Sequence, residues 1–212
     1  DSTDWSTRLI YTACVDATCS TSNRQPITAR PMVIAHPNGG VMVLFATGSY
    51  FTNEDRSSLQ LQALYGVWDK LEASPTLIAK SDLVQQSILA EVSATSTRVI
   101  SNNEVNYGSK RGWYLNLLTP GLSTGVGERV ITDIQLREDQ LVVTSMLPST
   151  DPCDYGGKSW LLELAPLTGS RLSYPVFDIN ADGKIDSNDN QTVTIDGKSV
   201  TLPASGKGFD EI

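Results

Sequence analysis

The chain has 212 residues, of which 40% are hydrophobic, and it carries a formal net charge of −8 with a pI of about 4.6. This length is enough for one substantial core or for two small ones. The lack of a basic cluster argues against nucleic-acid binding, an anionic membrane surface would repel the chain, and no apolar run approaches the roughly 18 residues of a membrane span. The polar opening "DSTDWSTR" is typical of a piece of a longer protein rather than of a signal peptide.

The first chemical feature along the chain is a pair of cysteines. Cys14 and Cys19 stand in "CVDATC", a spacing that predicts a small loop closed by a disulfide. The alternative, half of a zinc site, lacks a second Cys or His pair. Cys153 is left over, either buried and free or paired with a cysteine outside this chain. A local disulfide indicates an oxidising compartment, the periplasm or the cell exterior.

Most of the chain reads as short β-strands. Glu138-Asp139 lies between two such runs as a hairpin turn, Ser87–Ser101 favours a long strand or a strand pair, and Asp55–Gln62 offers only a helical turn. The runs rich in β-branched and aromatic residues are Met42–Phe51, Leu61–Asp69, Gly112–Leu118, Arg129–Arg137, Gln140–Leu147 and Ser159–Ala165.

Strand-then-turn units recur in "ALYGVWDK" and "WLLELAPLTGSRL", as they do in the blades of β-propellers. Blades take ~40–45 residues each, so 212 residues would give an unusually small closed ring. A portion of a larger propeller, or a distorted one, fits better. The sequence therefore predicts an all-β fold with little helix and antiparallel sheets of up to about four strands.

The strongest motif is "DINADGKIDSND", residues 178–189. Its oxygen ligands follow the order of an EF-hand loop, with Gly183 permitting the sharp turn and Lys184 offering its backbone carbonyl. Extended chain is expected on both sides, so this is an EF-hand-like loop not flanked by helices. Ca²⁺ suits it better than Mg²⁺, and the alternative is an Asx-rich turn without metal. The predicted ligands are Asp178, Asn180, Asp182, Lys184 and Asp186, with Asp189 the least certain because its arm is shorter than that of glutamate.

The search for catalytic groups gives little. His36 is the only histidine and lies in "AHPNGG", which predicts a loop, and no serine has the G-x-S-x-G pattern of a nucleophile elbow. "GVGER" is a lone G-x-G, a weak sign of phosphate binding. The four tryptophans, Trp5, Trp68, Trp113 and Trp160, either line a sugar groove or belong to the core, and their place in or beside strands favours the core.

Several segments together resemble the PilY/PilC family, the tip-associated adhesins of bacterial type IV pili. They are "QPITARPMVIAHPNGGVMVLFATGSYF", "LYGVWD", "KRGWYLNL", "GERVITDIQL", "PSTDPCDYGGKSWLLELAPLTG" and "FDINADGKIDSND", in that order from about Gln25 to Asp189. The resemblance implies that residues 1–212 are part of one modified β-propeller domain, in the C-terminal portion of a much longer protein. The Arg-Gly-Asp tripeptide of some members does not occur in this sequence.

The resemblance also implies a function. It implies a non-enzymatic, calcium-binding domain that supports pilus biogenesis, with calcium loading coupled to pilus extension and retraction, and adhesion to surfaces or host cells. The implied partners are minor pilins of the pilus-tip complex and host-cell or surface receptors, and the implied location is the pilus tip, associated with the outer membrane and reached through the periplasm. The alternative from another class is a secreted β-fold hydrolase with a structural calcium. Converging acids, or a His–Ser pair beside a groove, would favour the hydrolase.

Overall fold

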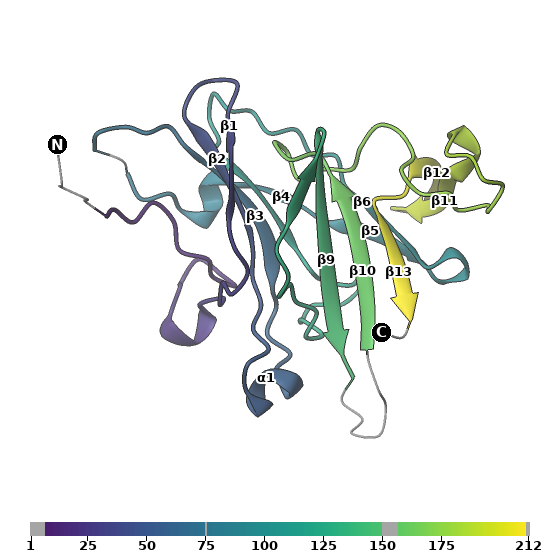
Figure 1. Ribbon diagram of the computed structural model, residues 1–212, viewed down its shortest axis with the longest axis horizontal. Coiled ribbons are helices and arrows are strands. Elements are labelled where there is room, and N and C mark those ends of the chain that lie inside the picture. The colour runs from purple at the N-terminus through teal and green to yellow at the C-terminus, as the bar shows by residue number, and fades with distance from the viewer. Residues whose placement is uncertain (1–6, 75, 150–156, 211–212) are drawn as a thin grey trace.

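The computed structural model describes residues 7–74, 76–149 and 157–210 (Figure 1). Two large sheets and one separate hairpin make up most of this part of the chain, and α-helix is confined to a single short segment. Neither large sheet closes on itself. The predicted all-β fold class with little helix is therefore confirmed.

The first sheet contains five strands. They are β1 (Met32–Ala35), β2 (Val41–Ala46), β3 (Ala63–Asp69), β4 (Val84–Gln86) and β7 (Gly112–Asn116). Their order is β1-β2-β3-β7-β4, and all neighbours are antiparallel except β4 and β7, which are parallel. The central strand β3 is buried on both faces, which explains why its sequence "ALYGVWD" is almost continuously apolar.

The second sheet contains six strands, all antiparallel. They are β5 (Ile88–Val92), β6 (Thr97–Ile100), β8 (Gln135–Arg137), β9 (Gln140–Pro148), β10 (Gly157–Leu164) and β13 (Gly206–Asp210). The order is β5-β6-β13-β10-β9-β8. β13, the last of these strands in the sequence, therefore lies between β6 and β10, which come earlier in the sequence. The expectation of sheets of up to about four strands was wrong, because β13 joins the β5–β6 hairpin to the β8–β9–β10 meander.

The hairpin and the short helices complete the fold. Figure 1 places the hairpin at the right-hand end of the molecule, and Thr95 donates a 2.9 Å hydrogen bond to Gln191 that ties it to the second sheet. These elements are β11 (Asn190–Ile195), β12 (Lys198–Pro203), α1 (Asn53–Ser57), and the 3-10 turns η1 (Thr21–Asn23), η2 (Lys80–Asp82), η3 (Ser93–Thr95) and η4 (Ser187–Asp189).

Several local predictions are confirmed by these elements. Residues 87–101 form a strand pair, β5 and β6, which η3 connects. Glu138 and Asp139 make the turn between β8 and β9. A helical turn does form near the predicted Asp55–Gln62, but it is α1, Asn53–Ser57, which starts earlier because reciprocal bonds between Thr52 and Asp55 cap its first turn. The strand predicted for Arg129–Arg137 was wrong over most of its length, since only its end forms β8.

The main core lies between the two sheets. It buries side chains from both of them, and Trp113 at its centre is fully buried, with its indole N–H donating to the Pro166 carbonyl at 3.0 Å. A second cluster covers the opposite face of β3, where Tyr65 packs against Phe45 and Tyr11. Burial of both faces makes the first sheet the middle layer of the structure.

The tryptophans divide between these environments. Trp113 and Trp68 are buried core residues, as predicted, whereas Trp160 is only partly buried. Trp5 and Cys153 lie outside the described residues. Trp160 lines a cavity on the second sheet.

His36 follows β1 in a turn, but it is buried rather than exposed. Its ring stacks on Trp68 and meets the edge of Tyr107, both at a centroid distance of 4.3 Å. Nδ1 accepts a hydrogen bond from the Asn38 backbone N–H at 3.1 Å, so the proton of the neutral ring sits on Nε2, which is buried without a hydrogen-bond partner. This burial lowers the pKa of His36 below its ordinary value of 6.5.

We therefore expect the free energy of unfolding to decrease as the pH falls from about 6.5 through the folded-state pKa of His36. The unfolded chain binds a proton near pH 6.5, whereas the folded chain resists protonation because the ring is buried and Nδ1 must stay an acceptor. Urea unfolding at a series of pH values measures the decrease, and His36→Phe serves as the control without the ionising group. The NMR titration of this single histidine should have a midpoint below 6.5; a midpoint at or above that value would contradict the prediction.

Candidate functional site

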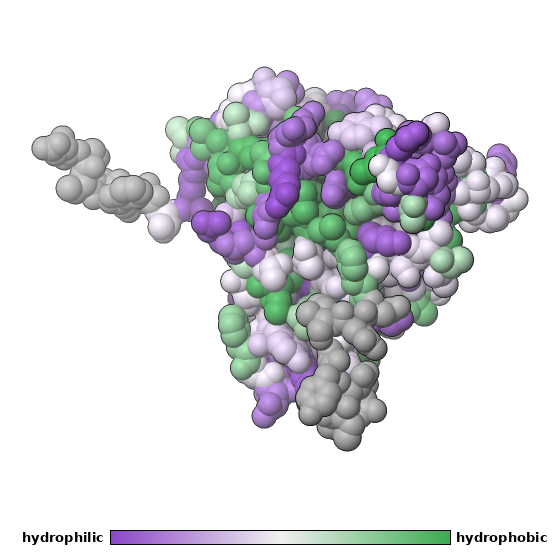
Figure 2. Space-filling view, turned by 45° about the vertical axis from the view of Figure 1, so that its right-hand side comes forward, coloured by the Kyte–Doolittle hydropathy of each residue, from purple (hydrophilic) through white to green (hydrophobic). Residues whose placement is uncertain are grey.

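The EF-hand-like loop lies between an irregular segment and β11, so strands and turns, not α-helices, flank it. Figure 2 shows hydrophilic residues gathered over the region where Figure 1 places the β11–β12 hairpin and its loop. Ala181 and Gly183 have φ angles of 59° and 82°, so the chain turns sharply twice within the loop. A Cβ atom at Gly183 would have no other atom within 4 Å, so space does not require glycine here. Glycine serves at this position because it adopts the positive φ angle without strain.

The predicted ligand side chains hold the loop through hydrogen bonds to backbone N–H groups. Asp178 accepts from Gly183, Asn180 from Asp182, and Asp182 from Lys184, each at 2.9 Å. Asp186 accepts from the backbone N–H of Asn188 at 2.8 Å. These local turns explain why the motif curls without a helix: each side chain bonds to backbone a few residues ahead of it.

Asp189 holds the two ends of the loop together. It is buried, and its carboxylate accepts from the backbone N–H groups of Ile179 at 2.7 Å, Asn180 at 3.3 Å and Asp186 at 2.9 Å. The bonds from Asp186 and Ile179 hold the pKa of the Asp189 carboxyl below its ordinary value. Both of its oxygens are thus occupied by the backbone, which favours a closing role for Asp189 over a metal-ligand role.

The other acidic side chains keep unused acceptor capacity. Asp178 Oδ1 is buried and has no hydrogen-bond partner, an arrangement that costs free energy unless a cation or water fills it. Asp182 uses Oδ1 for the Lys184 backbone, and its Oδ2 has only a 3.4 Å contact with the Asn180 amide. Hard oxygen donors of this kind, with the Lys184 carbonyl, fit a calcium ion.

No group of three or more His, Cys, Asp or Glu side chains gathers as a metal site in the part of the chain that the structure describes. The four carboxylates among the predicted ligands, those of Asp178, Asp182, Asp186 and Asp189, therefore do not gather as such a group in this structure. Calcium binding by the loop stays a prediction.

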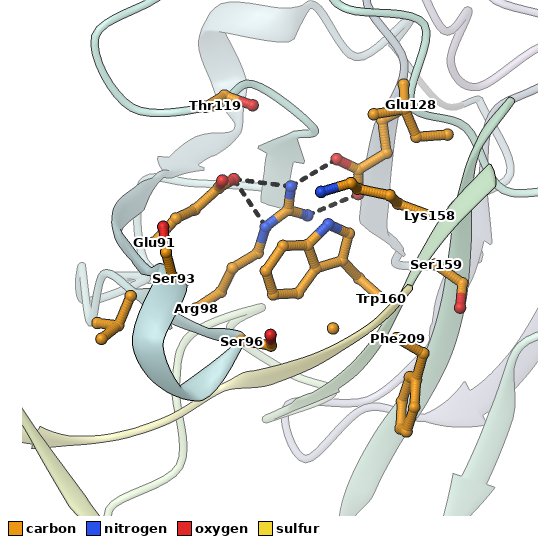
Figure 3. Close-up of a pocket in the computed structure, with 13 residues that line it drawn as sticks. Glu91, Ser93, Ser96, Arg98, Thr119, Glu128, Lys158, Ser159, Trp160 and Phe209 are labelled. Carbon is orange, nitrogen blue, oxygen red and sulfur yellow. Dashed lines mark hydrogen bonds and ion pairs between the residues drawn. The ribbon is translucent and has the colours of Figure 1, made fainter. Parts of the chain in front are cut away.

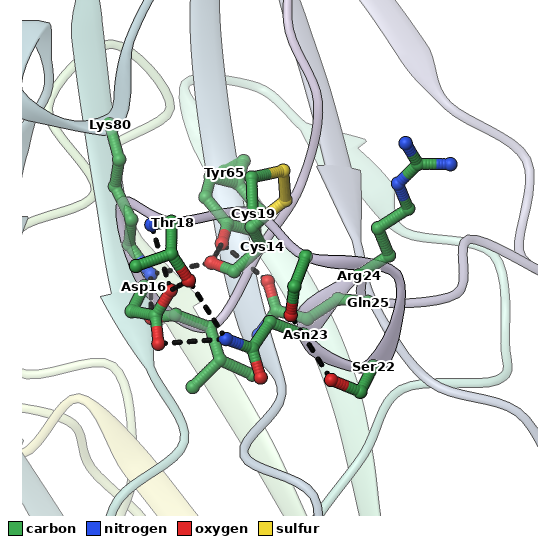
Figure 4. Close-up of a disulfide and its surroundings, with 12 residues drawn as sticks. Cys14, Asp16, Thr18, Cys19, Ser22, Asn23, Arg24, Gln25, Tyr65 and Lys80 are labelled. Carbon is green, nitrogen blue, oxygen red and sulfur yellow. Dashed lines mark hydrogen bonds between the residues drawn. A yellow bond between two sulfur atoms is a disulfide. The ribbon is translucent and has the colours of Figure 1, made fainter.

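A second local feature is the loop between Cys14 and Cys19, which are joined in a disulfide with a Cα–Cα distance of 5.2 Å (Figure 4). Asp16 closes the loop from within by accepting bonds from the Thr18 hydroxyl at 2.6 Å and the Asn23 amide at 2.8 Å. The pairing that the spacing predicts is the pairing present in the structure.

Lys80 anchors this loop to the first sheet. Its ammonium donates to the carbonyls of Cys14 and Val15, both at 2.9 Å, and lies 4.6 Å from the centroid of the Tyr114 ring. Burial lowers the pKa of Lys80 to about 8. The loop is thus held by a covalent bond, by Asp16 and by a partly buried lysine, a combination that suits a structural element.

The chain is similar to known proteins in both sequence and fold. Residues 1–100 match the family model described as the PilY1 beta-propeller domain. The type IV pilus biogenesis factor PilY1 of Pseudomonas aeruginosa strain PAO1 is 33% identical over an alignment of 219 positions. This alignment covers 89% of this chain. A PilY1 homolog of Xylella fastidiosa is 34% identical over 149 residues, covering 69% of this chain.

The chain belongs to the PilY1 family. A crystal structure of the Pseudomonas aeruginosa PilY1 C-terminal domain superposes with a TM-score of 0.79 and 28% identity, over 95% of this chain and 42% of that one. The modified propeller architecture expected from the sequence is therefore confirmed. The chain spans about a fifth of the length of the curated PilY1 relative, 19%.

One feature of this chain could not be found from the sequence. Arg98, Glu128 and Glu91 form an ion cluster on the second sheet. Glu91 faces Arg98 across the β5–β6 pair, whereas Glu128 lies 30 residues from Arg98 in the chain. In sequence each is an ordinary charged residue in or beside a strand, and nothing in its neighbours signals burial. Among the described residues, no helix is long and apolar enough to cross a membrane.

Proposed function

We propose that this chain is a calcium-binding part of a type IV pilus biogenesis factor. The observation that supports the pilus role most strongly is the 33% identity to PilY1 across 89% of the chain, since that protein is named as a biogenesis factor and not as an enzyme. A 28% identical solved structure with the same fold supports it further. The implied location is the pilus tip, associated with the outer membrane, with minor pilins as partners and surface or host-cell receptors as adhesion targets.

The calcium part of the proposal rests on the loop. Asp178, Asn180, Asp182 and Asp186 would bind one Ca²⁺ through side-chain oxygens and Lys184 through its carbonyl, at the spacing that a calcium loop uses. The unpartnered Oδ1 of Asp178 supports calcium binding, because a buried carboxylate oxygen without a hydrogen bond is stabilised by a cation. A bound dication would also offset the repulsion among carboxylates packed into twelve residues.

A regulatory role fits the position of the loop. It continues directly into β11, and the hairpin leads into β13 at the centre of the second sheet. Loss of the ion would loosen the loop and the adjoining strand ends. Calcium could in this way control pilus extension and retraction.

Complementation in a piliated bacterium tests the proposal. A strain lacking the gene that encodes this chain should lose surface pili and twitching motility, and the wild-type gene should restore both. The same gene with Asp182→Ala should give pili whose number and motility no longer respond to calcium. Normal piliation without the gene would overturn the pilus role, whereas a calcium response unchanged by Asp182→Ala would overturn the calcium role alone.

A further inference from the structure

A cavity of about 390 Å³ lies on one face of the second sheet, apart from the EF-hand-like loop (Figure 3). Residues of β5, β6 and β10 line it, with η3 at one side and the segment that carries Thr119 and Glu128 over it. Its lining mixes apolar groups such as Val92 and Leu147 with charged and hydroxyl side chains. A cavity with a few polar groups in this size range is of the kind that binds a ligand or a partner's side chain.

The buried ion cluster forms the floor of this cavity. Arg98 Nη1 and Nη2 donate to the two oxygens of Glu128 at 2.6 and 2.7 Å, and Arg98 Nε and Nη2 reach Glu91 Oε1 at 2.9 and 2.8 Å. Ser145 also donates to Glu128 at 2.5 Å. The side chains of Arg98 and Glu128 are 2% and 1% exposed, whereas Glu91 is 26% exposed.

Arg98 and Lys158 supply two positive charges and Glu91 and Glu128 two negative charges, so the ionised side chains that line the cavity carry no net charge. Glu128 is fully bonded within the cluster, but Glu91 uses only Oε1. Its Oε2 has no hydrogen bond to a described residue, and Glu91 lines the cavity. Glu91 Oε2, a carboxylate oxygen, can therefore accept a hydrogen bond from a group in the cavity, while Arg98 holds the other oxygen of the same carboxylate.

Trp160 argues against a sugar stacked on an aromatic ring. The Arg98 guanidinium carbon lies 3.8 Å from the centroid of the Trp160 ring. Trp160 also faces Gly208 across the β10–β13 pair, so closely that a Cβ at Gly208 would lie 3.1–3.3 Å from three carbons of its six-membered ring. With the guanidinium and this backbone both against the ring, the indole has little free face for CH–π stacking.

We propose that this cavity binds the cationic head of a lysine or arginine side chain from a protein partner. Glu91 Oε2 forms the ion pair, and the hydroxyls of Ser93 and Ser96, which line the same cavity, accept further hydrogen bonds. The net charge of −8 favours the approach of a basic partner. The site thus fits a basic segment of another protein.

NMR titration with small probes tests this inference. The probe is a capped Gly-Lys-Gly peptide, and its matched control is the same peptide with an acetylated lysine, which has nearly the same shape and no charge. The indole N–H signal of Trp160, assigned by its loss in Trp160→Phe, reports on the cavity. The charged peptide should shift this signal in a saturable way and the acetylated peptide should not. Equal shifts from both peptides, or no shift from either, would overturn the proposal.

Variants locate the binding. Glu91→Gln keeps the bond to Arg98 but removes the charge, so it should weaken lysine binding about tenfold, while Glu104→Gln, at an exposed position, should not. Ser93→Leu narrows the cavity without touching an ion pair and should weaken binding too, which keeps the test valid if Glu91→Gln unfolds. Lys158 lines the cavity and repels a cation, so Lys158→Met should leave binding equal or tighter. Weaker binding of the lysine peptide in Lys158→Met would contradict the proposal.

A free diamine shares the chemistry of a lysine head. Putrescine, titrated under the same conditions, distinguishes the two sources. A protein partner predicts that the capped lysine peptide binds at least as tightly, because its backbone adds contacts at the rim. Tighter binding of putrescine would overturn the assignment to a protein side chain.

Discussion

Replacing Asp182 with alanine should weaken calcium binding by more than about 100-fold, because even residues that only orient metal ligands typically contribute 10–100-fold. Asp182 offers a charged oxygen beside Gly183, and its second oxygen has only a weak contact within the loop. Isothermal titration calorimetry should find one Ca²⁺ per wild-type chain. Asp139→Ala, which removes the same charge from an exposed turn, is the matched control. Identical calcium binding in the wild type and Asp182→Ala would show that this loop is not the site.

Thermal unfolding gives an independent measure of the same effect. A ligand that binds only the folded state stabilises it by about 2.7 kcal/mol at a hundredfold excess over Kd, so calcium should raise the Tm of the wild type but not of Asp182→Ala. Asp189→Ala should behave differently. Because Asp189 accepts three backbone N–H groups, its removal should lower the Tm without calcium as well. A variant Tm equal to that of the wild type in the absence of calcium would contradict the closing role of Asp189.

Replacing Arg98 with methionine should lower the free energy of unfolding by about 3–5 kcal/mol, the usual cost of breaking a buried ion pair by removing one partner. Methionine fills a similar volume, so packing against Trp160 changes little, but Glu128 is left charged and 1% exposed. Glu91 loses its partner at the same time. Urea unfolding with linear extrapolation measures the difference.

An exposed ion pair supplies the control. Arg30 lies 3.3 Å from Asp133, and their side chains are 80% and 49% exposed. Water screens this pair, so Arg30→Met should cost no more than about 1 kcal/mol. Similar losses in Arg98→Met and Arg30→Met would show that burial does not decide the strength of the Arg98 cluster.

Local sequence was sufficient where the interacting groups are neighbours in the chain. The disulfide joins Cys14 to Cys19, and the EF-hand-like loop has its oxygens within residues 178–189. Spacing and side-chain chemistry alone predict such features, because the chain has few ways to arrange so short a segment. The turn at Glu138 and Asp139 and the β5–β6 pair were predicted for the same reason, because adjacent residues form them.

Contacts between distant segments were decided only by the tertiary structure. His36 was predicted to lie in a loop, and it does follow a strand, but only the folding of Trp68 and Tyr107 around it buries the ring. The size of the second sheet depends on β13, which comes from the end of the chain and enters between β6 and β10. Hydrophobic pattern shows that a strand has a buried face, but not which partners complete its sheet.

Residue patterns alone thus predict the all-β class and the disulfide, whereas the calcium-binding arrangement of the loop stays a prediction. Tertiary folding is needed to bring Glu128 to the Arg98–Glu91 pair beside Trp160. The physical reason is that a charged residue in a strand is normally solvated, and its burial depends on a compensating charge supplied by another segment. That compensation is a property of the folded chain, because it exists only once β5, β6 and the segment carrying Glu128 meet.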